Sequence, residues 1–261
     1  MRTTPIPEGC EIIDAKGLYV GPGLVDIHTH TGANYRLWQD PIPGAKFHLE
    51  HGTTTILACL YFNRNKEQWL GDIDVVTAAM ETEKAPNLIG YYMEGPYMNP
   101  DFGSDRKSCP WAGPIDPANY MPVLEAGAGF VRVWAVAPER ENILDFVKDA
   151  KRLDPTVRFA VGHSAAEPHQ IEPLMAYGLC LGTHHTNATG TIVKYPECRG
   201  VCVDETVNYN SEIYAELISD SRGVHVDPYM QRLVRKIKGD DRVILISDAT
   251  SGTGAPLPGF E

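Results

Sequence analysis

Short apolar runs rich in β-branched residues alternate along this chain with longer polar or amphipathic segments. Eight runs have the length of a strand: 24–30, 53–60, 88–94, 130–137, 158–164, 179–184, 213–219 and 242–248. Between several of them lie amphipathic stretches with helical spacing: 73–84, 142–153, 168–177 and 228–238. Strands that alternate with helices of this length predict βαβ units and a parallel sheet.

Eight units in about 225 residues favour a closed (β/α)₈ TIM-type barrel, an α/β fold, over an open doubly wound sheet. The sequence has no GxGxxG and no GxxxxGK[ST] motif, which would open the usual nucleotide-binding sheets. Residues 1–20 do not fit the pattern and are predicted to be a stub of a small β domain that is otherwise mostly missing. Residues 21–261 are predicted to be the barrel, without its last helix because so little chain follows the eighth run.

Composition narrows the class of protein. The 261 residues carry 23 Lys+Arg and 34 Asp+Glu, a net charge of −11, which argues against a nucleic-acid or anionic-membrane partner. No apolar run reaches the roughly 18 residues of a membrane span, and the first residues lack the apolar stretch of a secretory signal. Six cysteines without CxxC spacing predict reduced thiols in a cytoplasmic protein. The Cys198/Cys202 pair is only weak evidence for a metal site.

Candidate metal ligands lie at the ends of several predicted strands. His28 and His30 are two positions apart, so they would point to the same face of a strand and could share a cation. Because the active sites of such barrels lie at the carboxyl ends of the strands, four further side chains join them: Glu94, His163, His184 and Asp248. Imidazole and carboxylate ligands suit Zn²⁺ or Fe²⁺, as one ion or two.

Several motifs give the chain a family resemblance. Residues 21–30, GPGLVDIHTH, resemble the opening strand of the amidohydrolase superfamily. The segments MEGPYMNP (93–100), GHS (162–164), THHTNA (183–188), GVHVD (223–227) and SDAT (247–250) resemble the N-acetylglucosamine-6-phosphate deacetylase family, in the family's order. The resemblance covers residues 20 to 252.

The resemblance implies a role for each matching residue. Glu94, His163 and His184 would bind the catalytic metal, and His28 and His30 would help to hold a second one. Asp248 would be the general base and then the general acid, as metal-activated water hydrolyses the acetamide of an amino sugar. The implied substrate contacts are His225, Asn187, Ala188 and Arg199. His185 is expected to pack away from the site or to support it.

The sequence also departs from the family pattern. A lysine-rich stretch and a histidine normally follow the EGP segment, whereas residues 101–107 (DFGSDRK) contain no histidine and two aspartates. No arginine clearly matches the family's phosphate contact, although Lys194 and Arg199 lie in the corresponding loop. Deacetylation is therefore predicted more firmly than the requirement for a 6-phosphate.

Two alternatives remain open at this point. Another amidohydrolase reaction, on a cyclic amide or an N-acyl amino acid, would use the same HxH pair and the same aspartate. A truncated, non-catalytic barrel could instead bind a sugar or a partner protein. Strands left uncovered by a missing helix would expose an apolar face, so a homodimer is also expected.

Overall fold

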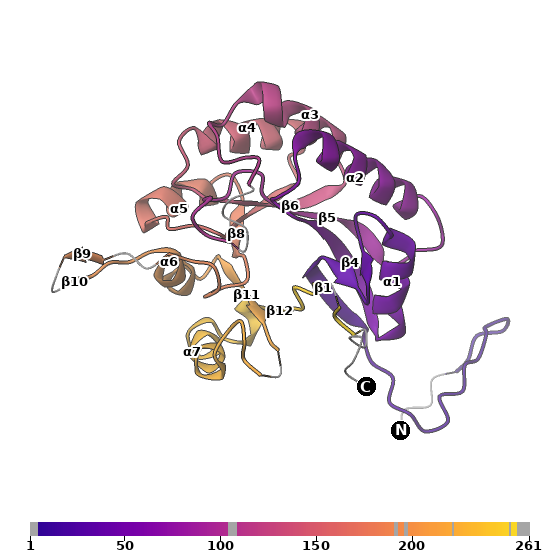
Figure 1. Cartoon of the computed structure of the whole chain (residues 1–261). Coiled ribbons are helices and arrows are strands. Elements are labelled where there is room, and N and C mark those ends of the chain that lie inside the picture. The colour runs from indigo at the N-terminus through magenta and orange to yellow at the C-terminus, as the bar shows by residue number, and fades with distance from the viewer. Residues whose placement is uncertain are drawn as a thin grey trace.

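Eight parallel strands curve into a barrel in the computed structural model of the chain (Figure 1). The structure describes residues 5–103, 109–190, 193–195, 198–220, 222–250 and 252–254. The sheet order follows the chain: β1 (Leu24–Thr29), β4 (Thr53–Leu60), β5 (Leu88–Glu94), β6 (Val131–Val136), β7 (Arg158–Val161), β8 (Leu179–Gly182), β11 (Tyr214–Ile218) and β12 (Val243–Ile246). The prediction of an α/β barrel is confirmed.

The barrel closes between β1 and β12 by contacts near its carboxyl-terminal mouth. One Asp26 carboxylate oxygen accepts hydrogen bonds from the backbone N–H groups of His28 and Ser247, at 3.2 and 3.3 Å. Just beyond β12, the Asp248 N–H donates to the His28 carbonyl at 3.0 Å. The carbonyl of Ala249 accepts from the N–H groups of His30 and Thr31, both at 3.1 Å. These bonds hold the two outermost strands of the sheet together where the candidate site lies.

Helices connect the strands and lie on the outer face of the curved sheet (Figure 1). They are α1 (Pro41–Glu50), α2 (Lys66–Met80), α3 (Pro117–Gly127), α4 (Ile143–Leu153), α5 (Pro168–Met175), α6 (Val203–Tyr209) and α7 (Pro228–Lys238), with a short 3₁₀ turn, η1 (Asp240–Arg242). Two small hairpins, β2 (Thr31–Gly32) with β3 (Tyr35–Arg36) and β9 (Val193–Tyr195) with β10 (Cys198–Arg199), lie in the loops.

Alternation along the strands separates two apolar layers. On β5, Tyr91 and Met93 belong to the layer between sheet and helices, whereas Tyr92 belongs to the barrel interior. On β4, Cys59 faces inward in the same way, while Leu60 faces the helices. Side chains alternate with a period of two, so every second residue faces the barrel interior. At the carboxyl ends of the strands these inward-facing residues lie at the mouth of the barrel.

The structure corrects some predicted helix boundaries. Helix α7 begins and ends where the pattern predicts, but α2 covers Lys66–Met80 rather than 73–84. Asn65 caps this helix: its side chain accepts a hydrogen bond from the Gln68 N–H, and the Gln68 side chain accepts one from the Asn65 N–H, both at 2.9 Å. Such a reciprocal pair satisfies two backbone donors at a helix start. The local capping signal therefore determines the start of α2.

Removing the Asn65 cap should destabilise the protein measurably. We expect Asn65→Ala to lower the free energy of unfolding by about 1 kcal/mol, because a helix-start donor loses its acceptor. Urea unfolding followed by circular dichroism measures this change. Asp40→Ala is a matched control, since Asp40 precedes α1 but its side chain makes no capping bond. Equal losses in the two variants would contradict the assigned capping role.

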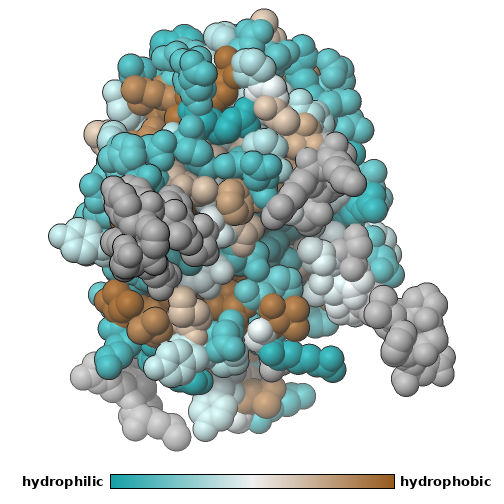
Figure 2. Space-filling view, turned by 60° about the vertical axis from the view of Figure 1, so that its left-hand side comes forward, coloured by the Kyte–Doolittle hydropathy of each residue, from teal (hydrophilic) through white to brown (hydrophobic). Residues whose placement is uncertain are grey.

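Residues outside the barrel are largely exposed. In the described part of the chain, residues 5–23 form no helix or strand and extend away from the barrel (Figure 1). Hydrophobic side chains form separate brown areas among polar ones on the face shown in Figure 2. Leu24, Val25 and Leu245, on β1 and β12, are each more than half exposed. None of the helices in the described ranges combines the length and the apolar character that a membrane span requires. The two-domain assignment and the homodimer stay predictions.

Candidate metal centre

The predicted ligands meet at the carboxyl-terminal mouth of the barrel, although several lie beyond the strands rather than on them. His163, His184 and Asp248 each follow the last residue of their strand by two positions. All three adopt left-handed backbone conformations, with φ of 47°, 27° and 44°. The predicted strands 158–164, 179–184 and 242–248 were therefore too long at their ends. Left-handed non-glycine residues are strained and concentrate at functional sites.

One group of ligands surrounds a single carboxylate oxygen. Glu94 Oε1 lies 2.7 Å from His163 Nε2 and 3.2 Å from His184 Nε2, and the two imidazole nitrogens are 2.9 Å apart. All three side chains are buried. Ligand atoms that share a tetrahedral zinc at bond lengths near 2.0 Å would be about 3.3 Å apart. The three atoms are slightly closer together than in such a shell, so a small outward movement would let them surround an ion.

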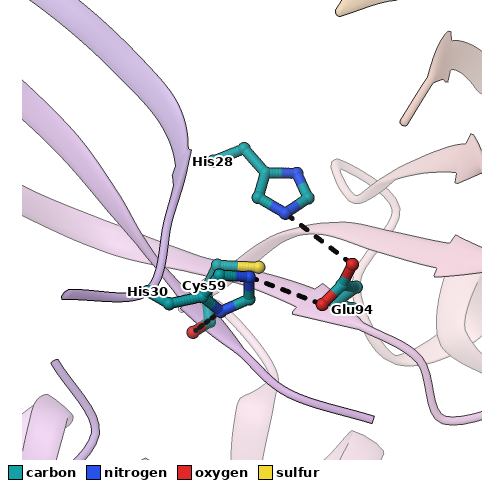
Figure 3. A group of neighbouring side chains, drawn as sticks. All are labelled: His28, His30, Cys59 and Glu94. Atoms are coloured by element: carbon teal, nitrogen blue, oxygen red, sulfur yellow. Dashed lines mark hydrogen bonds and ion pairs between the residues drawn. The ribbon is translucent and has the colours of Figure 1, made fainter. Parts of the chain in front are cut away.

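A second group shares the same glutamate. His28, His30, Cys59 and Glu94 come from or directly follow three adjacent strands and are buried (Figure 3). His30 Nε2 lies 3.5 Å from Glu94 Oε2, and His28 Nε2 lies 3.9 Å from Glu94 Oε1. One potential ligand atom from each of the four residues lies within 4.8 Å of the others. Glu94 can therefore contribute to two neighbouring cation sites.

The other nitrogen of each imidazole points to an acceptor. The Nδ1 atoms of His30, His163 and His184 lie 3.1 Å from the carbonyl oxygens of Cys59, Phe102 and Asn187, respectively. His28 Nδ1 lies 3.3 Å from the Glu216 carboxylate. A carbonyl oxygen can only accept, so Nδ1 carries the proton and the Nε2 lone pair faces the centre. Metal-bound histidines are oriented in this way.

The orientation of the imidazoles shows whether a metal ion fits the centre. Two Nε2 lone pairs 2.9 Å apart, both beside a carboxylate, repel one another unless a proton or a cation lies between them. His28 Nε2 is buried and has no hydrogen-bond partner within the described ranges. These unsatisfied atoms and the N/O/S donor set fit a divalent cation of the zinc type.

Electrostatics in the centre also favour a positive charge. Burial lowers the pKa of His30, but interaction with the neighbouring Cys59, the hydrogen bond to Asp248 and the negative charge of Glu94 outweigh that effect and raise it to about 10. The pKa of His184 is raised too, because hydrogen bonding to Glu94 and the nearby Asp248 charge exceed the effect of burial. A divalent cation would take the place of such protons.

Asp248 lies beside both groups and is partly open to solvent. Its Oδ1 atom is 3.2 Å from His30 Nε2 and 3.8 Å from His28 Nε2. Burial raises the pKa of the Asp248 carboxyl, but the His30 hydrogen bond and the neighbouring imidazole charges hold it well below its usual range. Asp248 is therefore ionised at neutral pH and can accept a proton.

A cavity of about 480 Å³ opens over the centre. Its walls include the predicted substrate contacts Asn187, Ala188 and His225, which the structure brings together. The Asn187 amide donates to the His225 carbonyl at 3.2 Å, so two loops meet at this rim. Arg199 lies on β10, but its side chain is outside the described part of the chain, as are Arg106, Lys107 and the Lys194 side chain.

Two acidic residues that the sequence analysis did not identify support the centre. Glu216, fully buried on β11, faces His28 Nδ1 and accepts from the His184 N–H at 3.2 Å. Glu139 accepts from the Ser164 hydroxyl and the Ala165 N–H, both at 2.7 Å, and from the Asn99 amide at 2.9 Å. Glu216 could have been identified from the sequence, because it is an acidic residue within the apolar run 213–219. No neighbouring motif indicates a role for Glu139.

His185 turns away from the metal groups, as expected, although not because of a regular strand. It is buried, and its Nε2 lies 3.2 Å from the side-chain oxygen of Asn208 on α6. Burial lowers the pKa of His185. The residue therefore packs the neighbouring helix against the barrel.

Known proteins resemble this chain over most of its length. A Bacillus subtilis N-acetylglucosamine-6-phosphate deacetylase is 26% identical over 247 residues, which are 89% of this chain and 58% of the relative. The Mycobacterium smegmatis enzyme of the same name superposes with a TM-score of 0.76 at 27% identity, over 89% of this chain and 64% of that one. A variant of that enzyme in complex with N-acetyl-D-glucosamine-6-phosphate matches with a TM-score of 0.76 and 27% identity, over 90% and 59%.

The chain thus spans about three-fifths of the length of the relatives it matches. No protein-family profile matches it. The resemblance predicted from the motifs is confirmed: over nearly nine-tenths of its length, the chain is similar to N-acetylglucosamine-6-phosphate deacetylases.

Proposed function

We propose that this chain is the catalytic barrel of a metal-dependent deacetylase that converts N-acetylglucosamine 6-phosphate to glucosamine 6-phosphate and acetate. The observation that supports it most strongly is the common orientation of four imidazoles, whose Nε2 atoms converge on Glu94 below an open cavity. The similarity to deacetylases over most of the chain supports the choice of an amide substrate.

Glu94, His163 and His184 would hold the catalytic ion, Zn²⁺ or Fe²⁺, and His28 and His30 would contribute to a second site. A bound divalent cation lowers the pKa of water to about 7 and polarises an amide carbonyl. Asp248 would accept the proton of the attacking water through Oδ1 and return it to the amine, which is a poor leaving group as an anion. The left-handed backbone at Asp248 directs this carboxylate toward His28 and His30.

The rim of the cavity would orient the sugar. His225 Nδ1 lies 3.1 Å from the Asp220 carboxylate, which also accepts from the N–H groups of Val224 and His225. These backbone hydrogen bonds hold the pKa of Asp220 well below its usual range. An anchored His225 and the neighbouring Asn187 amide can present polar groups to sugar hydroxyls. The thiols of Cys10, Cys59, Cys180 and Cys202 are reduced, which is consistent with the proposed reducing, cytoplasmic setting.

Acetate release by the purified, zinc-loaded chain tests the proposal. N-acetylglucosamine 6-phosphate should release one acetate per molecule, whereas dihydroorotate and N-acetyl-D-amino acids should be poor substrates. Efficient turnover of either of the latter would favour the alternative amidohydrolase reactions. A stably folded, metal-loaded chain that hydrolyses none of these compounds would favour the non-catalytic binding barrel.

The preference for the phosphate should be modest. We expect kcat/KM for the 6-phosphate sugar to exceed that for N-acetylglucosamine by less than about 100-fold, near 2.7 kcal/mol. Among the described residues that line the cavity there is no lysine or arginine, and a phosphate clamp usually depends on such charges. Both constants are measured on one enzyme preparation. A preference of several thousand-fold would contradict this expectation, and Arg199→Ala would then test where the clamp lies.

A further inference from the structure

Cys59 is buried beside the HxH pair, and packing of the core alone does not explain the direction of its sulfur. It lies on β4, one strand away from the HxH pair, and its inward-facing side chain is fully buried in the barrel interior. Figure 3 shows its sulfur directed toward the space that His28 and His30 border, rather than toward the helices. The only donors that the sequence motifs identify around that space are nitrogen and oxygen atoms.

Within the described part of the chain, one nitrogen atom beside this space lacks a hydrogen-bond partner and could bind an ion. His28 Nε2 is fully buried and has no hydrogen-bond partner among the described residues. His30 Nε2 is 3.5 Å from Glu94 Oε2, and its Nδ1 is occupied by the Cys59 carbonyl. Cys59 thus contacts the same histidine ring through its backbone and places its Sγ beside the opposite nitrogen, within 4.8 Å of the other donors.

We propose that the Cys59 thiolate is a metal ligand, which completes an N₂SO site with His28, His30 and Glu94. This inference rests on the proposed metal-dependent function and specifies the chemistry of its second site. Four protein donors around one ion are typical of tetrahedral zinc. A thiolate ligand favours Zn²⁺ or Co²⁺ over oxygen-preferring ions such as Mg²⁺ and Mn²⁺. The site formed by Glu94, His163 and His184 has no sulfur donor, so the two sites would differ in metal preference.

The alternative is a cysteine that merely fills space. Leu57, Tyr92 and Val133 belong to the same interior cluster, and buried cysteine packs well as a small apolar side chain. That alternative predicts no change in metal binding when sulfur is replaced by oxygen. Metal ligation by the Cys59 sulfur predicts that the Cys59→Ser protein loses one specific absorption band.

Cobalt reports on sulfur ligation directly. The purified chain is stripped of metal, titrated with Co²⁺ and examined by absorption spectroscopy. The wild type should develop a near-ultraviolet thiolate-to-cobalt charge-transfer band during one of the two binding steps. Cys59→Ser should lose this band and keep the visible ligand-field bands of histidine-bound cobalt. Its zinc affinity at the second site should fall by more than the roughly 10–100-fold that loss of an outer-shell partner costs.

Cys180→Ser is the matched control, because Cys180 lies on β8 and is not part of either ligand group. It should retain the charge-transfer band. A wild-type protein that binds two cobalt ions without the band, or a Cys59→Ser protein that retains it, would overturn the proposal. The wild-type spectrum alone decides the matter if Cys59→Ser does not fold.

The spectrum and acetate release separate this inference from the proposed reaction. A sulfur-to-cobalt band in a protein that releases no acetate would uphold the ligand and refute the deacetylase activity. Acetate release by a protein whose two cobalt ions give no such band would refute the ligand alone.

Discussion

The Asp248→Asn protein should release acetate about 10²–10⁴-fold more slowly than the wild type, the usual contribution of a general acid and base. Asparagine keeps the shape of the side chain and can still contact His30, but it cannot accept the proton of an attacking water. The ionised state of the wild-type carboxylate depends on its position 3.2 Å from His30 Nε2 and 3.8 Å from His28 Nε2.

Metal content separates a chemical role of Asp248 from a structural one. Because Glu94, His163 and His184 are untouched by this change, elemental analysis should still find the ion that they hold. Asp241→Asn is a suitable control, since Asp241 is an exposed residue of η1 and does not line the cavity. Near wild-type turnover by Asp248→Asn would show that the carboxylate is structural.

Glu94→Gln should have the second large effect, because both ligand groups contain this carboxylate. The substitution preserves volume and removes the charge that the His163 and His184 nitrogens surround. We expect bound metal to fall sharply at both sites and acetate release to become undetectable in the purified protein. His163→Ala should deplete chiefly the site shared with His184, since His163 belongs to that group alone.

Thermal unfolding provides a readout of Glu94 that does not depend on activity. Ions that bind only the folded protein raise its apparent stability, so a chelator should lower the Tm of the wild type. The same chelator should barely change the Tm of Glu94→Gln. Glu125→Gln, on the solvent-facing side of α3, should behave like the wild type. Full metal occupancy in Glu94→Gln would disprove the shared-ligand assignment.

The strand pattern could be predicted from the sequence because it depends on local physical chemistry. Buried parallel strands are continuous apolar runs, and two of them, Thr53–Leu60 and Leu88–Glu94, have the predicted bounds. Helix α7 was equally readable, with its Asp227 cap and apolar face. In contrast, α1 and α3 contain internal prolines or glycine, which weaken the helical signal, and α6 covers only seven residues. These three helices were missed.

The placement of histidines and carboxylates after several apolar runs can be seen along the chain, and it predicts where a metal centre forms. Which other side chains reach that centre depends on how the barrel folds. Cys59 and Glu216 lie in apolar strands, 29 and 188 residues from the histidines they accompany, and become neighbours only when the barrel curves. Their role depends on distance across the curved sheet, whereas a sequence pattern records only distance along the chain.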